Sequence, residues 1–177
     1  MNNMIVKNKC KSLYAPWRQE YVTKASEEKE KTKDSNVCPF CKVEKDLQIL
    51  ETKKCFIQAN KYPYSAGHLL IIPKRHINQI TELTSIERKE LFNLIDLSVY
   101  SLDLFMKPEG YNIGCSIGRI AGESINHLHF HVLPRYKGDV GWNRICDFNV
   151  ISISPEKLTT QLRQIIKKEK LVTKFLF

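Results

Sequence analysis

The stretch NHLHFHVLPR, residues 126–135, decides the fold. Its histidines alternate with apolar residues, and successive side chains of a β-strand point to opposite faces. The alternation therefore predicts a strand with three imidazoles on one face, those of His127, His129 and His131. The apolar side chains between them are expected to point into the core: Leu128, Phe130 and Val132.

Three imidazoles on one strand face have few structural uses, and the whole chain has five histidines. Three interpretations are open. The face is a polar surface, which the clustering disfavours, or a catalytic zinc site with three histidine ligands, or the support of a nucleophilic histidine. In the third case a neutral imidazole attacks phosphorus through one ring nitrogen while the other donates its proton to a fixed acceptor. The product would be a nucleotidyl-histidine intermediate.

Apolar runs and turn residues on either side predict the remaining elements. A helix is expected after Thr84, which can form a capping box with Glu87, and should end at Pro108 and Gly110. Strands are expected over 55–59, 68–72, 111–117 and 127–133, and a last helix from Ser154-Pro155. This order predicts an α+β fold with an antiparallel sheet, a central helix and a C-terminal helix.

The composition indicates a folded chain. Its 177 residues fit one compact domain with a modest extension, and 42% of them are hydrophobic, which is enough for a core. No apolar run is long enough for a membrane span or a signal peptide, so we expect a cytoplasmic protein without a membrane partner. Six cysteines in such a chain predict thiols or metal ligands rather than disulfides.

Polarity along the chain predicts three segments. Residues 1–36 are expected to be an N-terminal extension and charged linker, 37–140 the main domain, and 141–177 a C-terminal segment and helix. The net charge is +9, and residues 157–174 carry six basic residues against one acidic residue. A basic surface attracts polyanions, but a solvated helix face is the favoured interpretation, so nucleic acid is not an expected partner.

The pair Cys38 and Cys41, in the sequence CPFC, spaces two thiols as a zinc knuckle does. Alone, the pair is equally compatible with a redox dithiol or with two unconnected cysteines. The spacing therefore indicates two ligands of a candidate metal site and does not identify the other ligands.

Several motifs in order resemble the histidine triad (HIT) family, over roughly residues 38–136. They are the triad itself, the stretches 110–114 (GYNIG) and 118–124 (GRIAGES), and 60–68 (NKYPYSAGH) running into 73–76 (PKRH). The opening LYAPWR at 13–18 and PRYKGD at 134–139 are most similar to the bacterial diadenosine tetraphosphate phosphorylase (ATP adenylyltransferase) branch. The segment 140–149 departs from that branch, which leaves the acceptor open.

The resemblance implies a HIT-like fold and a set of site residues. His129 would be the nucleophile, His131 would hold the α-phosphate oxygens, and His127 would lie beside them or bind metal. Gly118 and Gly122 would offer backbone N–H groups and Ser124 a hydroxyl. The nucleotide site would also include Asn60 at the ribose, where a plain turn role is the alternative, and Asn112 near the phosphates, where a strand-edge role is the alternative.

In zinc-containing members of the family the remaining ligands match His76 and His127. The resemblance therefore implies a structural zinc held by Cys38, Cys41, His76 and His127, with four ligands and no open position for catalysis. No role is evident for the remaining cysteines: Cys10, Cys55, Cys115 and Cys146. Family members commonly pair across the central helix and the sheet edge, so a homodimer is expected.

The leading hypothesis is an enzyme that cleaves diadenosine polyphosphates at the α-phosphorus through a nucleotidyl-histidine, with phosphate or water as acceptor. Alternatives within enzymes are a nucleoside phosphoramidase and a general nucleotide hydrolase. A third class is a non-catalytic regulatory module that binds nucleotides, or nucleic acid through the basic C-terminal helix. The intact triad argues against this last hypothesis.

Overall fold

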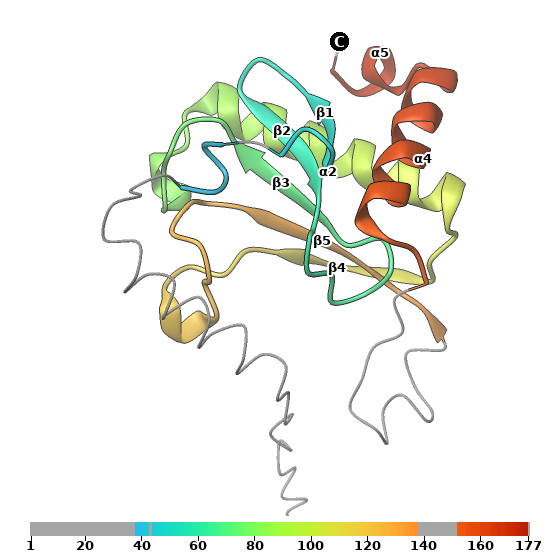
Figure 1. Ribbon diagram of the computed structural model, residues 1–177. Coiled ribbons are helices and arrows are strands. Elements are labelled where there is room, and N and C mark those ends of the chain that lie inside the picture. Colours follow the sequence, from blue (N-terminus) through green and yellow to red (C-terminus); the bar gives the residue numbers. More distant parts are fainter. Residues whose placement is uncertain (1–37, 43, 138–151, 177) are drawn as a thin grey trace, which may run out of the picture.

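The computed structural model describes residues 38–42, 44–137 and 152–176. Their centre is a five-stranded antiparallel sheet of order β1-β2-β3-β5-β4 (Figure 1). The strands are β1 (Gln48–Glu51), β2 (Cys55–Ala59), β3 (Leu69–Pro73), β4 (Gly110–Gly114) and β5 (Phe130–Arg135). The sheet thus sets β5 between β3 and the edge strand β4.

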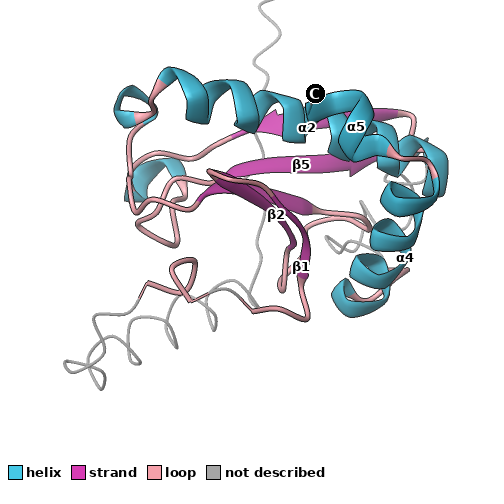
Figure 2. Ribbon diagram, turned by 90° about the horizontal axis from the view of Figure 1, so that it is seen from above, coloured by secondary structure: helices cyan, strands magenta, loops and turns pink. Residues whose placement is uncertain are grey.

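Helices cover one face of the sheet (Figure 2). The helix α2 (Ser85–Phe105) begins at the N-cap Thr84, and both hydrogen bonds of the capping box with Glu87 are present. Ser154 caps α4 (Pro155–Lys168), and α5 (Leu171–Leu176) follows; both pack against α2. Two 3-10 turns complete the described elements: η1 (Ile80–Glu82) and η2 (Arg119–Ala121). Within the described ranges, no helix combines the length and apolarity that a membrane crossing requires.

The main core lies between the sheet and the helices. Ile57 and Ile71 from the sheet pack there with Leu94 and Leu97 of α2 and Leu162 of α4. A smaller apolar cluster forms on its own from Phe56, Leu70, Ile72 and the loop residue Phe40. Because side chains alternate along β2, its Phe56 points away from the main core. The small cluster therefore lies on the sheet face opposite the helices.

The α+β class and the antiparallel sheet are confirmed, but several strand ends were predicted wrongly. The strand β5 starts at Phe130, not at residue 127. Phe130 pairs with Ile71, and no described residue before it pairs with β3. Before it, the Leu128 N–H donates to the carbonyl of Ile77, 2.6 Å away in the loop after β3, instead of to a ladder partner. Two short elements, β1 and α5, were not predicted, while β3 and β4 are displaced by one or more residues.

Candidate active site

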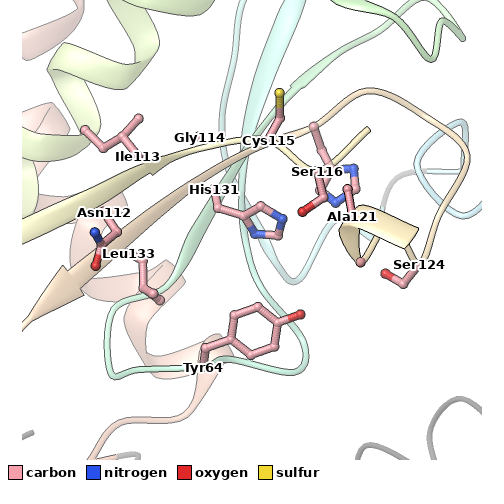
Figure 3. Close-up of a pocket in the computed structure, with 12 residues that line it drawn as sticks. Tyr64, Asn112, Ile113, Gly114, Cys115, Ser116, Ala121, Ser124, His131 and Leu133 are labelled. Carbon is pink, nitrogen blue, oxygen red and sulfur yellow. The ribbon is translucent and has the colours of Figure 1, made fainter. Parts of the chain in front are cut away.

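An open pocket of about 340 Å³ lies where β4, β5 and the loop between them meet. In Figure 3 the rings of His131 and Tyr64 lie side by side in it, 6.1 Å between centroids. The lining gathers five of the residues expected in the site: Asn112, Gly122, Ser124, His129 and His131. The pocket therefore unites parts of the chain that lie up to 69 residues apart in the sequence, from Tyr64 to Leu133.

The His129 ring has its protonation state fixed by the backbone. Its Nδ1 lies 2.7 Å from the carbonyl oxygen of His127, and a carbonyl only accepts hydrogen bonds. Nδ1 therefore carries the proton and Nε2 keeps a free lone pair. Burial lowers the pKa of His129 below its ordinary value, so the ring is neutral at neutral pH. A neutral imidazole with a free Nε2 is competent to act as a nucleophile.

The His131 ring is oriented by a chain of hydrogen bonds that begins at the backbone. The Tyr64 N–H donates to His68 Nδ1 at 3.1 Å, so His68 carries its proton on Nε2. His68 Nε2 then donates to His131 Nδ1 at 2.9 Å, which leaves the His131 proton on Nε2. His131 therefore has an N–H donor on the nitrogen that His68 does not contact.

The neutral forms in this chain are reinforced by burial. The pKa of His68 is lowered to about 3, by burial first and by the neighbouring His131 and His129 rings second. The pKa of His131 is lowered to about 4, by burial first and by the nearby His129 second. His68 was not assigned a role from the sequence, although it ends the motif 60–68 and is one of five histidines.

The loop before the triad is shaped by two glycines with positive φ, Gly118 at 85° and Gly122 at 93°. Gly122 and Ser124 line the pocket, whereas Gly118 does not. The Gly118 N–H donates instead to Glu123 Oε2 at 2.9 Å. A carboxylate thus occupies the backbone donor that was expected to face a phosphate, and the assignment of Gly118 stays a prediction.

The two asparagines differ in placement. Asn112 lines the pocket, and its Oδ1 accepts a hydrogen bond from Arg135 at 3.2 Å. Asn60 lies outside the lining: its Oδ1 accepts from the Tyr62 N–H, and its Nδ2 donates to His68 Nδ1 at 3.1 Å. Asn60 therefore supports the turn and the His68 ring, while its contact with a ribose stays a prediction.

The expected metal group is assembled. One ligand atom from each of Cys38, Cys41, His76 and His127 lies within 4.8 Å of all the others. His127 Nδ1 is 3.3 Å from the Cys38 sulfur, and His76 Nδ1 is 3.4 Å from the Cys41 sulfur. A tetrahedral zinc with ordinary bond lengths would set S and N about 3.6 Å apart, so the spacing fits such an ion.

Neighbouring groups hold the two histidine ligands. His127 Nε2 donates to the Pro73 carbonyl at 2.8 Å, which leaves the Nδ1 lone pair facing the thiols. The residue before His76, Arg75, donates to both carboxylate oxygens of Glu87 at 3.1 and 2.9 Å. This pair ties the loop after β3 to the first turn of α2.

Of the other cysteines, Cys55 is buried in the core and Cys115 lines the pocket, while Cys10 and Cys146 lie outside the described residues.

The fold, the pocket histidines and the metal group together define a class of protein, and comparison with known families identifies it. The family model described as HIT domain matches residues 42–138, more than half of the chain. The chain belongs to the HIT family, as its motifs predicted.

Three similar proteins show which members of the family this chain resembles. An AP-4-A phosphorylase of Mycobacterium tuberculosis is 29% identical over 143 residues, which cover 77% of this chain and 73% of that protein. The adenosine 5'-monophosphoramidase hnt1 of Schizosaccharomyces pombe is 30% identical over 141 residues, covering 75% and 98%. The crystal structure of a hypothetical histidine triad nucleotide-binding protein from Sulfolobus tokodaii strain7 is 29% identical, covers 75% and 94%, and superposes with a TM-score of 0.61.

Proposed function

We propose that this chain is an enzyme that cleaves diadenosine polyphosphates at the α-phosphorus through a nucleotidyl-His129 intermediate, by phosphorolysis or hydrolysis. The observation that carries the proposal is the His129 ring in the pocket, with its proton held by the His127 carbonyl and its Nε2 lone pair free. The similarity to an AP-4-A phosphorylase supports the choice of substrate.

In the first step, Nε2 of His129 attacks the α-phosphorus. The P–N bond forms, the P–O bond to the polyphosphate breaks, and the leaving group departs with the electron pair. The ring becomes positively charged while Nδ1–H stays bound to the carbonyl of His127, which stabilises that charge. In the second step phosphate or water attacks phosphorus, the P–N bond breaks, and the product is ADP or AMP.

The non-bridging oxygens gain negative charge as His129 attacks, so donors placed beforehand stabilise the transition state. His131 would supply its Nε2–H, Ser124 its hydroxyl, and Gly122 its backbone N–H. In this scheme Asn112 binds near the phosphates and Asn60 approaches the ribose. His131 donates in the neutral state because His68 fixes its tautomer.

The four-ligand group would hold a structural zinc. Such an ion, bound by two thiolates and two imidazoles, leaves no position for substrate and supplies rigidity. Cys38 and Cys41 would then tie the segment that precedes β1 to His127, two residues before the nucleophile.

A homodimer is part of the proposal. The strand β4 is the edge of the sheet, and its Ile113 side chain is 46% exposed. Phe92 of α2 is 60% exposed. A sheet edge that has no partner strand among the described residues, together with exposed apolar side chains, favours association with a second copy. Sedimentation equilibrium tests this directly, because Ile113→Lys should yield monomers if the edge forms the interface.

A phosphoramidase is the second candidate, and Glu123 is the observation that favours it. Its carboxylate accepts a hydrogen bond from the Gly118 N–H, and its negative charge acts on His129, where it partly opposes the larger lowering of the pKa by burial. A carboxylate there disfavours a polyphosphate leaving group and favours an amine, which leaves uncharged or cationic. The similarity to a monophosphoramidase agrees with this alternative.

Product identification with diadenosine tetraphosphate, with and without phosphate, tests the proposal. ADP plus ATP formed only with phosphate indicates phosphorolysis, whereas AMP plus ATP without phosphate indicates hydrolysis. Turnover of an adenosine phosphoramidate alone would favour the second candidate. No turnover of either substrate, with tight and salt-sensitive binding of DNA or RNA, would replace the enzyme hypothesis by the regulatory one.

A further inference from the structure

One of the two residues between the cysteines of the metal group is buried although the residues on either side of it are not. Phe40 is 5% exposed, while the adjacent Pro39 and Cys41 are exposed. The turn is closed by the Cys41 N–H, which donates to the Cys38 carbonyl at 3.0 Å. A turn at the surface thus directs its one aromatic side chain into the protein.

The Phe40 ring lies against both a metal-group histidine and the proposed nucleophile. Its centroid is 5.8 Å from that of His127 at 82°, and 5.1 Å from that of His129 at 63°. Edge-to-face pairs of this kind stabilise the structure by more than the burial of their apolar area alone. The same ring packs on Phe56 and Leu70, so it cannot withdraw from the histidines without opening that cluster.

The contact matters because one hydrogen bond does not fix a ring. The bond from Nδ1 to the His127 carbonyl holds one edge of His129 and leaves rotation about that edge. Phe40 contacts the His129 ring at 5.1 Å, and His131 contacts it at 4.9 Å and 69°. Two ring contacts and one hydrogen bond together fix the direction of Nε2.

We propose that Phe40 is a positioning residue that couples metal binding to the direction of the His129 ring. The inference rests on the proposed function, since it assigns His129 the attack. When Cys38 and Cys41 bind one ion, the spacing of the turn is fixed, and with it the place of the side chain between them. Without the ion only the cluster holds Phe40, so the turn can shift and the contact between Phe40 and the nucleophile becomes looser.

The test compares Phe40→Leu with a matched control, Phe56→Leu. Both positions belong to the same cluster, both are nearly fully buried, and both variants lose the same atoms. Among the described residues, Phe56 makes no ring contact with a histidine, so its variant reports the loss of packing alone. Zinc per chain, thermal unfolding, kcat and KM are measured for zinc-loaded protein.

Both variants should unfold a few degrees below wild type and keep their zinc. Phe40→Leu should lower kcat about tenfold with KM within about twofold, because a lost ring contact misdirects the attack and leaves binding intact. Phe56→Leu should keep kcat within about twofold, and Phe40→Tyr, which retains the ring, should restore it. Equal kcat values for the two leucine variants would overturn the proposal.

A second measurement does not depend on turnover. The ¹⁵N imidazole signals of His129, assigned by their loss in His129→Gln, are followed while a chelator removes zinc from folded protein. They should shift in wild type and in Phe56→Leu, and stay nearly unchanged in Phe40→Leu, where the coupling is already broken. Equal shifts in wild type and Phe40→Leu would refute the coupling. If the wild type transfers no nucleotide, the proposed function fails, and these signals still decide the coupling.

Discussion

Removing the His68 ring nitrogens should slow nucleotidyl transfer without weakening substrate binding. In His68→Phe, His131 Nδ1 loses its donor, so the proton of His131 is no longer confined to Nε2. Loss of one preorganised donor to charge that develops at an oxyanion lowers kcat by about 10²-fold, or about 2.7 kcal/mol. KM should change little, because the bond to His131 strengthens only as the phosphoryl oxygens gain charge.

The matched control is His68→Gln, whose amide N–H can reach His131 Nδ1 from about the place of the imidazole Nε2. Its kcat should lie within about tenfold of wild type, because the donor to His131 is retained. Single-turnover rates with diadenosine tetraphosphate separate chemistry from product release. Equal rates for wild type and His68→Phe would show that the tautomer of His131 does not matter. Equally slow Phe and Gln variants would trace the loss to packing.

Three further predictions concern the nucleophile, the metal group and acid. His129→Ala should lower kcat by about 10⁴-fold or more while nucleotide binding by calorimetry survives, and unchanged turnover would refute the mechanism. Metal analysis should find about one zinc per chain in wild type and almost none in Cys38→Ser; a zinc-free wild type would remove the metal site. Burial first, and the neighbouring His131 and His129 second, lower the pKa of His68 to about 3, so below pH 6.5 the unfolded chain binds a proton that the folded one excludes. Denaturant unfolding should therefore show stability falling from pH 6.5 to pH 4, by about 3 kcal/mol for this group, and His68→Phe should flatten that slope.

Sequence patterns predicted the parts of the fold that local chemistry determines. The capping box at Thr84 predicted the start of α2, and Ser154-Pro155 predicted the start of α4, because capping hydrogen bonds form within one turn of the helix. The start of β5 was missed because it depends on where β3 stops pairing, which periodicity does not encode. The strand β1 was missed because its four residues are too few to show a period.

Some features of the site were also predicted from local sequence patterns, and others depend on how distant segments pack. The alternation of the triad survives outside the regular strand, since His129 and His131 still meet ring to ring. The role of His68 could not be derived from spacing, because it arises from the pairing of β3 with β5, which brings together rings 63 residues apart in the chain. Phe40 was overlooked for a similar reason: its burial against His129 depends on how the cysteine turn docks on the sheet.

The most direct test of the central claim is to find the bond between phosphorus and His129. Enzyme mixed with diadenosine tetraphosphate without phosphate is quenched in base, where a phosphorus–nitrogen bond persists, and the peptides are analysed by mass spectrometry. In samples quenched early, an adenylyl group should appear on the peptide that contains His129, and it should decay with time as the acceptor, phosphate or water, attacks. Rapid turnover with no adenylyl peptide, or with the group on another residue, would contradict the account.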